Sequence, residues 1–164
     1  MGMDVYGREP ISEVGSYFRN NVWWWRPLWN YCITQYPELT EEVADNGHSN
    51  SGDGLDAKKA YELGKKLQED IDSGVVLQYK EEYMQYIESL PMLDCEYCEG
   101  TGTRRDKSIP TDTPTVPCGS APVNCNVCSG AGKVKDFSAN YPFSVENVQE
   151  FSKFLVCSGG FNIW

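Results

Sequence analysis

The sequence predicts an α+β domain with an aromatic-rich helical body, a small antiparallel sheet formed by the two termini, and an arm inserted between two parts of the body. Three observations support this prediction. Apolar residues recur with helical spacing on both sides of residues 95–135, a short β-prone segment lies near each end, and five of the seven cysteines lie within residues 95–135. A chain of 164 residues is long enough to bury a core of its own.

Near the N-terminus, residues 3–6 form a candidate strand that ends at Gly7, and residues 14–19 form a short second candidate. The next segment favours a helix, because its large apolar residues have the i, i+3, i+4, i+7 spacing of one helical face. These residues are Trp25, Leu28, Trp29 and Cys32. Since proline is tolerated in the first turn of a helix, Pro27 indicates that this helix begins near Arg26.

Residues 37–45 form a candidate short helix, and a polar, glycine-rich loop follows. Residues 55–72 predict an amphipathic helix with one solvated face and one buried stripe. The stripe consists of Ala57, Ala60, Tyr61, Gly64, Leu67 and Ile71. Ser73 and Gly74 end this helix, and residues 75–90 predict another. We expect the two to form a helical hairpin.

The last helix has Ser144 as a good N-cap, and its apolar face carries Val145, Val148, Phe151 and Leu155. Gly159 and Gly160 end it. The apolar segment 161–164 then predicts a final strand. We expect this strand to pair with residues 3–6, so that both termini share one antiparallel sheet.

Charge divides the chain into three parts and disfavours some functions. The formal net charge is −10, which opposes a main affinity for phosphate backbones or anionic membranes. Residues 95–135 carry a net charge of +1, against −9 for residues 1–94 and −2 for residues 136–164. We therefore predict a body formed by residues 1–94 and 136–164, with residues 95–135 as the arm. Without an export leader or a long apolar stretch, the expected location is the cytoplasm.

The arm contains one motif twice. Residues 95–102 read CEYCEGTG and residues 125–132 read CNVCSGAG, so both fit CxxCxGxG. Two cysteines three positions apart on a tight turn can direct both sulfurs at one ion, and glycine permits the sharp turn that follows. Two such pairs complete a tetrahedral zinc shell. The sequence therefore predicts one structural zinc ion per chain, held by Cys95, Cys98, Cys125 and Cys128.

Free thiols and redox-active CxxC pairs are the alternatives to zinc. Redox pairs favour a helix N-terminus, and the glycines after each pair oppose an immediate helix. With no export signal the thiols are expected to stay reduced, which also favours metal ligands over disulfides.

The two octets resemble the cysteine-rich, zinc-binding repeats of DnaJ-type co-chaperones, and this resemblance implies that the four cysteines are zinc ligands. It covers the arm alone. That family has four repeats and two zinc sites, whereas this chain has two repeats and lacks the His-Pro-Asp signature of a J-domain. The flanking segments YFRNNVWWWRPLW and YPFSVENVQEF resemble small uncharacterised proteins of bacteriophages and environmental sequences, which implies the cytoplasm of a host cell.

Between the two motifs, residues 103–124 are rich in proline and poor in apolar side chains. We expect the zinc site to present this segment to another protein. Basic residues of the arm leave nucleic-acid binding as an alternative, which the acidic body opposes. These residues are Arg104, Arg105, Lys107, Lys133 and Lys135. Cys118, in the same segment, is expected to be a free thiol, with replacement of a zinc ligand as the alternative.

The tract Trp23, Trp24 and Trp25 is unusual, because three adjacent indoles cannot all face one core. We expect a thick aromatic core, with Arg26 stacked on an indole, together with an interaction surface. An aromatic groove for a ligand is the alternative.

Three further residues have less specific interpretations. Cys32 and Cys157 lie in apolar helical patterns and are expected to be small core residues. His48 lies in a polar loop with acidic neighbours, where we expect it to be solvated. A His–carboxylate catalytic or metal site is the alternative for His48.

These observations favour a non-enzymatic function, that of an intracellular zinc-binding accessory or adaptor protein that acts through protein–protein contacts. The sequence contains no glycine-rich phosphate loop, GxSxG or HExxH motif. The first alternative is a small enzyme or ligand-binding protein with an aromatic pocket near residues 23–29. The second is nucleic-acid binding through the basic arm. Homo-oligomer formation is left open.

Overall fold

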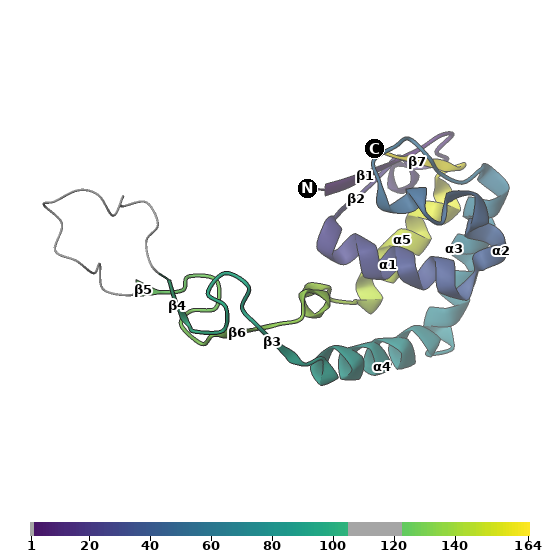
Figure 1. Ribbon diagram of the computed structural model, residues 1–164. Helices are drawn as coiled ribbons and strands as arrows, with labels where there is room; N and C mark the ends of the chain where they lie inside the picture. The colour runs from purple at the N-terminus through teal and green to yellow at the C-terminus, as the bar shows by residue number, and fades with distance from the viewer. Residues whose placement is uncertain (1, 105–122) are drawn as a thin grey trace, which may run out of the picture. The chain divides into compact units, whose positions relative to one another are not determined.

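The computed structural model describes residues 2–104 and 123–164 (Figure 1). Arg105, Lys107 and Cys118 lie outside the described residues, so the expectations for them stay predictions. The chain divides into two compact units: Met1–Glu88 with Asn140–Trp164, which we call the body unit, and Ser89–Ala139, which we call the cysteine unit. Helices predominate and the strands form small antiparallel sheets, which confirms the predicted α+β class.

The sheet of the body unit has the strand order β2–β1–β7 and joins the two ends of the chain (Figure 1). Strand β1 (Gly2–Gly7) pairs antiparallel with both β2 (Tyr17–Asn21) and β7 (Phe161–Ile163). The predicted pairing of the two terminal strands is therefore confirmed. The second strand begins later than predicted, because Glu13–Gly15 form a 3-10 turn, η1, before it.

Helix α1 (Val22–Gln35) begins well before the predicted start at Arg26. The Oδ1 atom of Asn21 accepts hydrogen bonds from two backbone N–H groups of the first turn, at 3.0 and 3.1 Å. This cap supports a turn ahead of Pro27, which consequently lies inside the helix. The predicted apolar face is confirmed, because Trp25, Leu28, Trp29 and Cys32 are all buried.

Short elements and then two longer helices follow α1. They are α2 (Pro37–Thr40), η2 (Glu41–Val43), η3 (Asn46–His48), α3 (Ala57–Asp72) and α4 (Val75–Ser89). Both predicted amphipathic helices are present, and Gly74 separates them with a φ of +82°. Along the described residues, no helix has the combined length and apolarity that crossing a membrane requires.

Helix α5 (Val145–Cys157) is capped by Ser144, as predicted, and packs along α3 (Figure 1). The predicted α3–α4 hairpin is therefore wrong, because α5 is the main packing partner of α3. The two helices approach closely at Gly64, where a Cβ atom would lie 2.9 Å from Cγ2 of Val156. The Oγ atom of Ser152 donates a hydrogen bond to the Gly64 carbonyl at 2.8 Å. A residue without a side chain is thus what lets the two backbones meet.

The core of the body unit is rich in aromatic residues whose polar atoms have partners. The indole N–H of Trp25 donates to the Gly47 carbonyl at 2.7 Å, and that of Trp29 donates to the Ala44 carbonyl at 3.2 Å. These bonds tie the η2–η3 segment to α1. Burying an indole without such a partner would carry the cost of an unsatisfied polar group.

Replacing Asn21 by alanine removes the α1 cap, and we expect the free energy of unfolding to fall by about 1 kcal/mol in chemical denaturation. Asn21→Asp keeps an acceptor oxygen at the same place and should leave stability nearly unchanged. If the alanine variant is as stable as the wild type, the cap does not explain the early start of α1.

Candidate metal centre

The cysteine unit brings four sulfur atoms together. The Sγ atoms of Cys95 and Cys125 lie 3.9 Å apart, those of Cys98 and Cys128 lie 3.7 Å apart, and all four lie within 4.8 Å of one another. Disulfide sulfurs lie about 2 Å apart, so these pairs are not disulfides. Four sulfurs each about 2.3 Å from a central ion would lie about 3.8 Å from each other in a tetrahedron. The group could therefore hold a metal ion.

Each CxxCxGxG motif makes the same turn after its second cysteine. Glu99 and Ser129 both have a φ of +52°, and the glycines that follow them, Gly100 and Gly130, have φ values of +78° and +85°. These are left-handed backbone conformations, which glycine adopts without strain. The glycines of the motif are thus explained by the turn.

The turn also directs a backbone N–H at the second sulfur of each pair. The amide of Gly102 lies 3.3 Å from Sγ of Cys98, and the amide of Gly132 lies 3.3 Å from Sγ of Cys128. An N–H donor stabilises a thiolate, which is the form of cysteine that binds metal ions.

The two motifs are related by an approximate twofold symmetry. The amide of Cys95 donates to the Gly132 carbonyl at 2.8 Å, and the amide of Cys125 donates to the Gly102 carbonyl at 2.8 Å. The short strands repeat this exchange: β3 (Met92–Asp94) pairs with β6 (Lys133–Lys135), and β4 (Thr103–Arg104) pairs with β5 (Val123–Asn124). Each motif thus completes the backbone hydrogen bonding of the other.

The four sulfurs lie in an enclosed site, because no cysteine of the group is more than 7% exposed. Burial raises the pKa of the Cys95 thiol to about 11. Backbone N–H groups of Cys128 and Val127 lower the pKa of Cys125 to about 7. A closed four-sulfur shell leaves no open coordination position for water or substrate, which is typical of structural rather than catalytic metal sites.

Two basic residues of the arm, Arg104 and Lys133, form contacts within the cysteine unit. Nη1 of Arg104 donates to Oδ1 of Asn126 at 2.7 Å, and its guanidinium lies 5.2 Å from the centre of the Tyr97 ring. Lys133 forms an ion pair with Asp94 at 3.3 Å. These contacts bridge the two motifs, so both residues have a structural role in the unit.

The three adjacent tryptophans lie in different environments. Trp25 is fully buried, Trp24 is half-buried and Trp23 is 38% exposed. Arg26 does not stack on an indole as expected. Its guanidinium lies over the ring of Tyr141, 5.7 Å from the centre, and Trp23 contacts the same ring. Trp25 therefore lies in the core, where it leaves no room for a ligand, whereas Trp23 lies at the surface.

His48 is half-buried, so the expectation that it is solvated is wrong. Its Nε2 lies 2.9 Å from Oδ1 of Asn30, and its Nδ1 is buried without a hydrogen-bond partner among the described residues. Burial, and then the charge of Arg26, lower its pKa. The carboxylate of Asp45 opposes this shift without hydrogen bonding to the ring.

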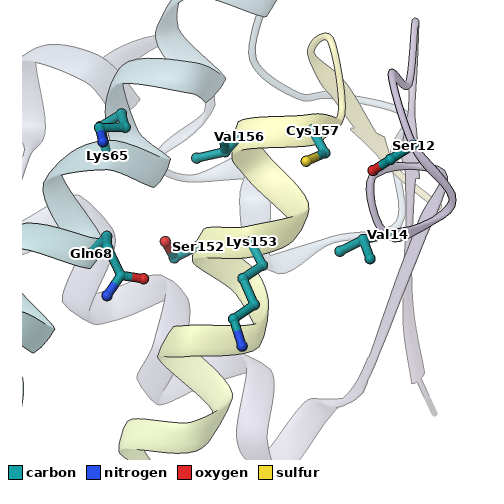
Figure 2. Close-up of a pocket in the computed structure, with 8 residues that line it drawn as sticks. All are labelled: Ser12, Val14, Lys65, Gln68, Ser152, Lys153, Val156 and Cys157. Carbon is teal, nitrogen blue, oxygen red and sulfur yellow. The ribbon is translucent and has the colours of Figure 1, made fainter.

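A groove on the body unit was not predicted from the sequence (Figure 2). It extends along α5, and Figure 2 shows Lys65 and Gln68 of α3 on one side of this helix and Ser12 and Val14 on the other side, near Cys157. Cys157 is half-buried there, so it is less enclosed than the core residue expected, whereas Cys32 is fully buried as expected. Tyr61, expected on the buried stripe of α3, is 52% exposed along the same groove.

Comparisons with known proteins add no relative. No protein-family model matches the chain, no curated protein is similar to it, and no solved structure matches its fold. The arguments about the site therefore rest on its own geometry.

Alanine at Gly102 or Gly132 should disrupt the metal centre. The new Cβ atom would lie 2.3 Å from the Gly130 carbonyl oxygen in the first case and 2.3 Å from that of Gly100 in the second, each at a positive φ. We expect each variant to bind an added divalent ion at least about tenfold more weakly in competition with a chromophoric chelator. Ala131→Ser, at the exposed position directly before Gly132, is the matched control. A loss in one glycine variant alone would contradict the twofold arrangement.

His48 should make the stability of the body unit depend on pH. Because its folded pKa is lowered, the unfolded chain binds more protons once the pH falls below about 6.5, and the stability present above that pH is progressively lost. Unfolding free energies measured from pH 8 to pH 5 should therefore fall more steeply in the wild type than in His48→Gln. Parallel pH profiles would show that His48 is protonated equally well in both states.

Proposed function

We propose that this protein is a zinc-binding accessory protein in which one structural zinc ion is held by Cys95, Cys98, Cys125 and Cys128. The close approach of four buried sulfurs, all within 4.8 Å of one another, is the observation that carries the proposal. An all-thiolate tetrahedral shell fits zinc better than the hard cations calcium and magnesium, which require oxygen ligands. Reduced thiols fit a reducing compartment, and we place the protein in the cytoplasm for that reason.

The zinc ion would act on folding. Binding to the two cysteine pairs fixes both turns and brings the motifs into their reciprocal hydrogen bonds, so the binding free energy becomes folding free energy. The cysteine unit needs this contribution, because among its described residues the buried cluster contains Val134 as the one apolar neighbour of the four cysteines.

We further propose that the cysteine unit is a module for contact with another protein. Apolar side chains lie exposed next to the metal centre rather than beneath it: Tyr97 is 64% exposed, and Val123 and Val127 are also exposed. Exposed apolar groups close to one another on a rigid support are typical of protein interaction surfaces. Nucleic-acid binding is less well supported, since Arg104 and Lys133 already contact groups of the unit and the net charge is −10.

Native and denaturing mass spectrometry of the purified protein should show one zinc ion per chain. Cys95→Ser and Cys128→Ser should each lose the ion or bind it at least about tenfold more weakly, because each removes one of four ligands. Cys157→Ser, in the body unit, is the matched control and should keep it. Full zinc content in both ligand variants would overturn the proposed site.

The adaptor role can be tested separately. Affinity capture should be carried out with the wild-type protein and with the Cys95→Ser/Cys128→Ser double variant. We expect the wild type to capture a partner protein that is missing from the proteins captured by the variant. Circular dichroism should show that the helices of the body unit persist in the variant. A capture profile unchanged by loss of zinc would refute the proposed role of the cysteine unit.

A further inference from the structure

The groove between α3 and α5 has an apolar floor and an open top. It consists of two hollows of approximately 390 and 740 Å³, which share Lys65 and Val156 along their boundary. The larger one is lined by Ile11 and Tyr61, whose side chains are 79% and 52% exposed. Large apolar side chains gathered in one hollow indicate a site that another molecule covers.

The rim of the groove is positively charged, although the whole chain is acidic. Lys58, Lys65 and Lys153 line it, and all three are exposed. Within the described parts of the chain, none of them forms an ion pair. Glu62 is the one acidic side chain in the lining of these hollows. The groove therefore fits an occupant that presents both apolar and acidic side chains.

Helix α4 of the same chain has such a face. At 100° per residue, Leu77, Glu81, Met84 and Glu88 fall on one narrow stripe. Leu77 and Met84 are exposed, and the two glutamates are exposed without an ion pair in the part of the chain that the structure describes.

The opposite face of α4 is held by its own chain. The rings of Tyr79 and Tyr83 lie 4.9 and 6.0 Å from that of Phe143, and the Tyr83 hydroxyl donates to the Tyr141 carbonyl at 2.9 Å. Folding α4 back onto the groove of the same chain would break these contacts. The acidic stripe is therefore free to meet the groove of another copy.

The spacings of the two surfaces correspond. Lys58 and Lys65 are seven positions apart, as are Glu81 and Glu88, which is about 10 Å along either helix. In an antiparallel arrangement, Lys58 would lie beside Glu88 and Lys65 beside Glu81. In this register Met84 lies one position, about 1.5 Å along the helix, from the point opposite Tyr61, and Leu77 lies one position from the point opposite Gln68.

We propose that the protein forms a symmetric dimer in which α4 of each copy occupies the α3–α5 groove of the other. Mutual insertion makes two identical contacts about a twofold axis and closes the assembly. This proposal goes beyond the zinc-dependent function and involves the body unit alone. An anionic membrane is a poorer occupant, because it is flat and would be repelled by a net charge of −10.

The test uses two charge-reversal variants of the full chain. Lys58→Glu/Lys65→Glu makes the groove acidic, so that it repels the acidic stripe of α4. Glu81→Lys/Glu88→Lys makes the stripe of α4 basic, so that the basic groove repels it. Sedimentation velocity should show that each variant alone dimerises at least about tenfold more weakly than the wild type. An equimolar mixture should restore wild-type dimerisation as a heterodimer, because both of its contacts then pair opposite charges. Net charge does not explain such rescue, since both variants stay acidic overall.

Two single substitutions add a second test and a control. Tyr61→Glu should weaken dimerisation at least about tenfold by placing a charge in the apolar floor, and Lys135→Glu, in the cysteine unit, should have no effect. A wild type that is monomeric at every concentration overturns the proposal, as does a mixture that stays monomeric. Zinc content should be the same in all these variants, so failure here is separate from failure of the metal site.

Discussion

We propose that the cysteine unit depends on the attraction between its four buried sulfurs and one cation, which takes the place of a hydrophobic core. Four thiolates within 4.8 Å would repel one another strongly in a low-dielectric site without a cation. With the ion bound, the two CxxCxGxG turns are fixed face to face, and each supplies the carbonyl that the first cysteine amide of the other requires. The glycines then become indispensable, since Gly102 and Gly132 are the points of closest backbone approach.

The body unit is stabilised differently. Its core consists of stacked and edge-on aromatic rings, and the polar atoms of those rings are bonded to the segments that surround them. Tyr31 and Tyr36 both donate to Asp70, at 2.7 and 2.6 Å, which fixes α1 and the residue after it against α3. The helices α3 and α5 meet at Gly64. This unit should therefore fold without zinc, which is why metal removal is expected to affect one part of the chain and spare the other.

Local patterns in the sequence predicted much of this arrangement. The repeated octets identified the four cysteines that come together, and apolar spacing identified α3, α4 and α5. Short β-prone segments near both ends of the chain predicted the terminal strand pair. Features that depend on tertiary contacts were not predictable in the same way. Proline statistics placed the start of α1 too late because the Asn21 cap was not considered. Tyr61 has helical core spacing yet lines a groove, since α5 rather than α4 covers α3. The twofold exchange between the motifs joins Cys95 to Gly132 and Cys125 to Gly102, residues more than twenty positions apart, which no local pattern shows.

X-ray absorption spectroscopy at the zinc edge of the purified protein tests the central claim most directly. The account predicts a single shell of four sulfur atoms at about 2.3 Å from the ion, with no nitrogen or oxygen ligand. A shell containing oxygen or nitrogen would mean that the four cysteines do not close the site. Absence of zinc, with the cysteines paired as disulfides, would contradict the claim that a metal ion organises the cysteine unit.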